Sequence, residues 1–174
     1  GRYVDVKVNA GEVVRREAAT APPGLVRLSP ILTDPYQPLE RKYPSHPGIT
    51  HYLIHSYDFA PIAKQGIPAA DKYAKIAPAA PHAQHMPSHI YSMVGMWEKS
   101  IGANLESVKV SNEYAAANKL DGRFPGVMHS WDFMQYAYLQ LGQDAKAKAL
   151  MEENAAVTKI FNQRITVDTA IAAI

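Results

Sequence analysis

Six of the seven histidines in this chain fall into three groups, and the spacing within each group places its members on one face of a helix. An imidazole can bind a metal ion or exchange a proton near neutral pH. The groups, with the carboxylates that accompany them, are His51, His55 and Asp58; His82, His85 and His89; and His129 and Asp132. The surface that these side chains share is therefore the first place to look for a function.

The spacing supports a metal site between two neighbouring helices. His51 and His55 are four residues apart, as are His85 and His89, so each pair can offer two ring nitrogens from one helix face. Imidazole nitrogens and carboxylates bind divalent zinc, iron, copper or nickel when three or four of them converge. We predict these four histidines as metal ligands, with Asp58 as a further ligand or as a residue that orients one of them. The spacing matches no common zinc motif.

Two other interpretations of the histidines stay open. In the first, they are structural and hold neighbouring helices together through hydrogen bonds. In the second, they line a polar groove that binds a peptide, a protein or a small ligand. The sequence has no Gly-Lys-Ser/Thr loop, no Gly-x-Ser-x-Gly motif and no cysteine, so catalysis rests on the histidines alone. We expect a binding module rather than an enzyme, with a metal-binding protein or metal-dependent enzyme as the alternative.

Composition indicates one ordinary globular domain. The chain has 174 residues, of which 47% are hydrophobic and 20% are charged. A net charge of +2 without a basic patch does not favour nucleic-acid binding. The absence of cysteine excludes disulfides and thiolate metal sites without identifying the compartment. No apolar stretch approaches the roughly 20 residues that span a bilayer.

The first 46 residues differ from the rest because prolines interrupt them repeatedly. Asp34 and Pro35 can cap and start a short helix near residues 35–43. We expect an irregular N-terminal arm over residues 1–46 and a helical domain over residues 47–174. The helical pattern stops at Ile174 without a cap, which predicts a longer natural protein, with any signal peptide upstream of Gly1.

From residue 47 onward the pattern alternates between helix and turn. One unit has a turn at Gly95 and a second helix from Trp97, and another has its turn at Gly142. With Ala147 at position 20 of a repeat of about 34 residues, Trp131 falls on the aromatic position 4. This pattern resembles the tetratricopeptide repeat, whose helix hairpins stack into a solenoid. The resemblance implies an all-α solenoid of about three hairpins, whose exposed end would be a surface for a homodimer.

A narrower resemblance rests on the strings HPGITHYLIH at residues 46–55 and APHAQHMPSHI at residues 80–90. These strings are similar to those of an uncharacterised bacterial family of tetratricopeptide-repeat proteins, and the similarity covers roughly residues 40–174. It implies a fold and no reaction.

The repeat register also implies which side chains face a ligand. The first helix of each hairpin lines a concave groove in such repeats, at positions separated by three and four residues. The implied groove residues are His51, His55, Asp58, His82, His85, His89, His129, Asp132 and Tyr136. Pro87 tests this register, because a helix that starts there would leave His82 and His85 in a loop. Pro81 is well placed as a first helical residue, so we expect a helix that starts at Pro81 and bends at Pro87.

Overall fold

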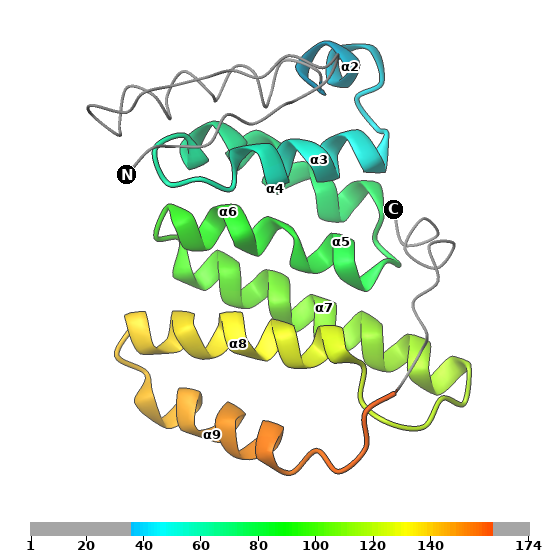
Figure 1. Cartoon of the computed structure of the whole chain (residues 1–174), viewed down its shortest axis with the longest axis vertical. Helices are drawn as coiled ribbons and strands as arrows, with labels where there is room; N and C mark the ends of the chain where they lie inside the picture. Colours follow the sequence, from blue (N-terminus) through cyan, green and yellow to red (C-terminus); the bar gives the residue numbers. More distant parts are fainter. Residues whose placement is uncertain (1–35, 162–174) are drawn as a thin grey trace, which may run out of the picture.

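The computed structural model describes residues 36–161, so the predicted arm over residues 1–46 lies outside the described residues as far as residue 35. Within that range the chain is a stack of packed helices without a β-strand, which confirms the all-α helical-hairpin class (Figure 1). The helices are α2 (Tyr36–Lys42), α3 (Pro47–Tyr57), the 3₁₀ turn η1 (Ala63–Gly66), α4 (Ile67–Ile76), α5 (Pro81–His85), α6 (Pro87–Met93), α7 (Trp97–Ala117), α8 (Pro125–Gln140) and α9 (Asp144–Ala155). No helix in this range is long and apolar enough to cross a membrane.

Three helical hairpins follow one another along the long axis of the molecule (Figure 1). The first pairs α3 with α4, the second pairs the α5 and α6 segments with α7, and the third pairs α8 with α9. Helix α2 packs on α3 at one end of the stack. It lies within residues 35–43, where the sequence predicts a short helix. Successive hairpins also touch, since α4 contacts α6 and α7 contacts α8.

Glycines and prolines set the helix boundaries. Gly95 and Gly142 have φ angles of +77° and +66°, a conformation that glycine adopts without strain. Around them the amides of Met96 and Gln143 bond back to the carbonyls of Tyr91 and Tyr138, both at 2.8 Å, which closes the preceding helices in Schellman turns. Proline occupies the first turns of α3, α4, α5 and α8, where a missing N–H costs nothing.

The hydrophobic core consists of two clusters of buried side chains. Leu53, Ile54, Tyr73, Met86 and Ile90 form a fully buried cluster between the first two hairpins. A second cluster, centred on Trp131 and Met134, packs α8 against its neighbours. Close helix contacts need small side chains, and Ala147, which the repeat register places at position 20, is buried, as are Ala69 and Ser100.

Pro87 divides the first helix of the second hairpin into α5 and α6. The helix starts at Pro81, and Met86 between the two segments keeps helical angles of φ −52° and ψ −37°. Because Pro87 has no N–H, the hydrogen-bond ladder is interrupted there and the helix is divided into two segments. His82 and His85 therefore lie on a helix, as expected from Pro81.

Candidate metal centre

Four helical segments bring six imidazoles together. Helix α3 supplies two of them and α5, α6 and α8 supply the rest, while Asp58 follows α3 as its C-cap. Neighbouring rings have centroids between 4.6 and 6.3 Å apart along the whole group. We call this group the histidine cluster: His51, His55, His82, His85, His89 and His129. His46 lies apart from it, where its Nδ1 accepts a hydrogen bond from the Ile49 amide at 3.3 Å.

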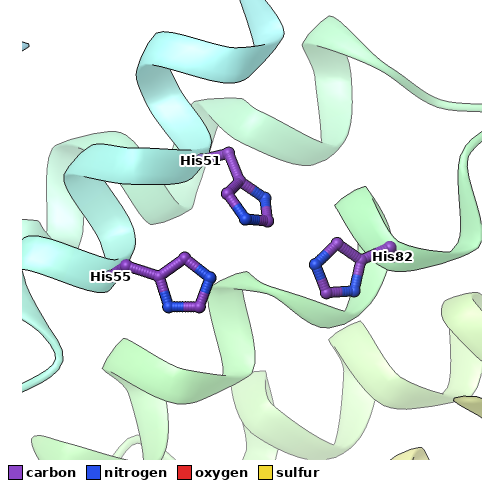
Figure 2. A group of neighbouring side chains, drawn as sticks. All are labelled: His51, His55 and His82. Carbon is purple, nitrogen blue, oxygen red and sulfur yellow. The ribbon is translucent and has the colours of Figure 1, made fainter. Parts of the chain in front are cut away.

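The first half of the cluster is the triad of His51, His55 and His82. Each ring has a nitrogen within 4.8 Å of a nitrogen on the other two, which is close enough for one ion to bind all three. Figure 2 shows the rings from α3 and α5 gathered around a common space. His51 is buried and its Nδ1 lies 3.3 Å from the Tyr73 hydroxyl, whereas His55 and His82 are exposed to solvent. This triad is therefore accessible to an ion.

The second half is the triad of His85, His89 and His129, whose ring nitrogens meet the same 4.8 Å limit. Phe133 packs against all three rings, with centroid distances of 4.9, 4.9 and 5.1 Å. An aromatic ring in this position excludes water from one side of the triad and limits the rotation of the imidazoles. His85 is 3% exposed, so its orientation is set by protein contacts rather than by solvent.

Asn104 fixes the tautomer of His85. The Asn104 Nδ2 group donates to the Ser100 carbonyl at 2.8 Å, so its Oδ1 atom faces His85. That oxygen can only accept, so His85 Nδ1 carries the proton and donates across 2.7 Å. The Nε2 atom of a neutral His85 therefore holds a lone pair.

Asp58 has the same effect on His89. Its Oδ2 accepts a hydrogen bond from His89 Nδ1 at 2.8 Å, which again leaves Nε2 as the second nitrogen of the ring. The Nε2 atoms of His85 and His89 then face each other at 3.1 Å. Two lone pairs at this distance repel unless a proton or a metal ion lies between them. Metal-bound nitrogens about 2.0–2.1 Å from a tetrahedral ion are separated by about 3.3 Å, so the spacing suits one ion.

Burial keeps much of the cluster uncharged. Desolvation is the largest cause that lowers the pKa of His85 to about 3 and those of His51 and His82 to about 4, and repulsion between the imidazoles adds to it. His82 is solvent-exposed at one edge, but protein surrounds the rest of its ring. Desolvation also lowers the pKa of His55, while the charge of Asp58 opposes that shift. Neutral imidazoles are the form that binds metal ions.

Asp58 has a second oxygen with an unusual environment. Oδ1 is buried and has no hydrogen-bond partner among the described residues, while Oδ2 is bonded to His89. A buried carboxylate oxygen without a partner is costly unless a positive charge lies nearby. A cation held by the neighbouring imidazoles would supply that charge.

The sequence predicts one metal site from the histidines of two helices, whereas the structure divides these histidines between two triads. His51 and His55 belong to one triad, and His85 and His89 to the other, because the offset between hairpins places His82 beside the first pair. His129, predicted for the groove, completes the second triad. Of the three other predicted groove residues, Asp58 is bonded to His89, and two are exposed on α8 outside both triads: Asp132 and Tyr136.

Sequence reasoning did not identify Asn104, Tyr73 or Phe133 as parts of the site. A signal for Asn104 was present in α7, where small polar residues recur at intervals of three and four. All of these residues are buried: Ser100, Asn104, Ser107 and Ser111. A polar stripe on the inner face of a helix marks a contact with other polar groups, here the histidine cluster.

A cavity of about 580 Å³ adjoins the cluster. His82, His85 and His129 are among its lining residues, so both triads border the same space. The segment 77–81 also lines it, together with Ser107 and Ser111 of α7 and with Phe124. Pockets for small molecules commonly have about 300–1,000 Å³, so the cavity is large enough for one.

Comparison of the chain with protein-family models, with curated proteins and with solved structures found no match. The tetratricopeptide-repeat relationship therefore stays a prediction from sequence. A functional conclusion for this chain rests on the geometry of the histidine cluster.

Proposed function

We propose that this protein binds divalent transition-metal ions through the histidine cluster. The main site consists of His85, His89 and His129, and a second site consists of His51, His55 and His82. The proposal rests above all on the 3.1 Å contact between the Nε2 atoms of His85 and His89, whose Nδ1 atoms already donate to Asn104 and Asp58. A metal ion bound by both Nε2 atoms would remove the repulsion between their lone pairs.

The donor set narrows the choice of metal. Imidazole suits zinc, copper, nickel and iron, whereas calcium and magnesium prefer oxygen ligands. Each triad supplies three nitrogens, which leaves at least one coordination position of a tetrahedral ion open. Structural zinc sites usually fill all four positions with protein ligands, so three-histidine sites favour an ion that takes a further ligand.

Elemental analysis of variants tests this proposal. Protein freed of metal with a chelator, incubated with zinc and desalted, is expected to retain about two zinc ions per chain. His129→Ala and His82→Ala each remove one exposed ligand from one triad and should each lose about one ion. His46→Asn is the matched control, since asparagine can keep the helix cap outside the cluster. Equal zinc content in all three variants, or none in the unaltered protein, would refute the proposal.

A second candidate is a groove that binds a peptide or protein without metal. The observation that favours it is the exposed aromatic surface on α8, where Tyr136 is 54% exposed and packs edge-on against Trp97. Tyr136 follows His129 by seven residues, so both lie on one face of the helix. This candidate predicts that the purified protein retains no zinc and that added zinc leaves its melting temperature unchanged.

A further inference from the structure

The cavity beside the histidine cluster has two chemically different kinds of lining residue. The rings of His82, His85 and His129 border it. The segment 77–81 and Phe124 also border it, and their side chains are apolar. A ligand that fills this space would therefore have one group near the proposed metal ions and its body against hydrocarbon.

The charge of the lining restricts the ligand further. Among the described residues that line the cavity, none is aspartate, glutamate, lysine or arginine. A charged group in the body of a ligand would lose its hydration there without gaining a partner. A metal ion held by the histidine cluster would supply positive charge beside this uncharged lining.

Two serines provide a place for a neutral polar group. Ser107 and Ser111 lie one turn apart on α7, are 2% and 3% exposed, and both line the cavity. Ser130 donates a hydrogen bond to Ser107 Oγ at 3.3 Å, which leaves the hydroxyl proton of Ser107 available to an acceptor in the cavity. The cavity can therefore accept a carbonyl or ether oxygen in the middle of an otherwise apolar ligand.

We infer that the cavity binds a small monoacid whose apolar body fills the space along the segment 77–81 and whose single anionic head coordinates the metal ion of the histidine cluster. The inference rests on the proposed metal binding. Two features of the lining carry it: the three imidazoles and the absence of a charged side chain among the other described residues that line the cavity. The open coordination position of a three-histidine site accepts the head group.

Hydroxamic acids are suitable probes, because they combine a strong metal-binding head with a variable body. The full chain is loaded with Co²⁺, whose visible absorption reports changes in its ligands, and titrated with acetohydroxamic acid and benzohydroxamic acid. Burial of the phenyl ring is expected to make benzohydroxamic acid bind about 10- to 100-fold tighter than acetohydroxamic acid. Metal-free protein is expected to bind neither probe.

Two variants separate the cavity from the metal site. Ala79→Phe places a ring in the cavity from an exposed turn and should weaken benzohydroxamic acid at least tenfold, with Co²⁺ and acetohydroxamic acid binding unchanged. Ala149→Phe, on the exposed side of α9, is the control that should change nothing.

Each outcome decides between the two proposals. Co²⁺ binding with equal affinity for both probes, or with no effect of Ala79→Phe, would refute the cavity inference and leave the metal site standing. Probe binding to metal-free protein would also refute it. Failure to bind Co²⁺ would refute the proposed function and the inference together.

Discussion

Asp58, which follows α3, accepts a hydrogen bond from His89 of α6 at 2.8 Å, and this bond joins the first hairpin to the second. The carboxylate therefore has two effects. It holds two hairpins of the stack together, and it directs the Nε2 atom of His89 toward His85. Carboxylates that bond to metal-binding histidines in this way raise ligand basicity and fix the ring.

Asp58→Asn should weaken metal binding without removing a ligand. The amide oxygen can still accept from His89, but the negative charge is lost, so zinc affinity is expected to fall about 10- to 100-fold. Competition with a colorimetric chelator measures this change. Asp132→Asn is the matched control, because Asp132 is exposed on α8 outside both triads. Equal affinities for the two variants would show that Asp58 does not orient a ligand.

Asn104→Ala should release His85 from its fixed tautomer. The buried Nδ1–H group would lose its acceptor, and we expect a loss of about 1–3 kcal/mol in the free energy of unfolding. Zinc affinity should fall by about 10- to 100-fold, because the ring can then rotate. Asn118→Ala, at the exposed end of α7, is the control for both quantities. Nitrogen NMR of labelled histidine reads the tautomer directly, and an unchanged His85 signal in Asn104→Ala would contradict the assignment.

The metal-free protein should lose stability as the pH falls from about 6.5 to about 4. In the unfolded chain a histidine takes up a proton near its ordinary pKa of about 6.5. The folded protein does not, since burial lowers the pKa of His51 to about 4 and that of His85 to about 3. These histidines therefore leave the free energy of unfolding unchanged above pH 6.5. Below it they lower the free energy of unfolding, by up to about 1.4 kcal/mol per pH unit for each histidine.

Urea denaturation of metal-free protein at pH 7.5 and pH 5 measures this effect. His46→Asn should show the same decline as the unaltered chain, because His46 is exposed and outside the cluster. A free energy of unfolding that is the same at both pH values would mean that the cluster is not buried as described.

Gly66→Ala should destabilise the stack at the contact between α3 and α6. A Cβ atom at Gly66 would lie 2.7 Å from Tyr57 Cβ and 2.8 Å from Ile90 Cδ1, and both neighbours are buried. Overpacking of this kind costs about 1–3 kcal/mol. Gly102 is exposed on α7, and a Cβ atom added there meets nothing within 4 Å. Gly102→Ala should therefore stabilise the fold by about 0.5–1 kcal/mol. A lower melting temperature for Gly66→Ala together with a higher one for Gly102→Ala would support this packing. A change in the same direction for both variants would contradict it.

The parts of the fold that depend on local sequence could be predicted. Gly95 and Gly142 mark turns because their positive φ angles suit glycine, and Pro81 marks a helix start because its neighbours have helical spacing. Two small residues at the hairpin contacts were predictable for the same reason, since Ser100 and Ala147 follow Gly95 and Gly142 at the same interval.

The composition of each triad could not be predicted, because it depends on how one hairpin is offset from the next. His82 joins His51 and His55 across two hairpins, and His129 joins the second triad from a third. The spacing along a helix predicted the two histidine pairs but not the third histidine of each triad. Asn104 was missed because its hydrogen bond to His85 depends on how α7 packs against α5.

The central claim concerns which atoms would surround a bound ion, and X-ray absorption of zinc-loaded protein measures this directly. With one equivalent of zinc, we predict nitrogen ligands at about 2.0–2.1 Å and outer-shell scattering from three imidazoles. His129→Ala should reduce the number of imidazoles around the first ion, whereas His46→Asn should leave it unchanged. A spectrum that shows only oxygen ligands, without imidazole scattering, would contradict the metal site.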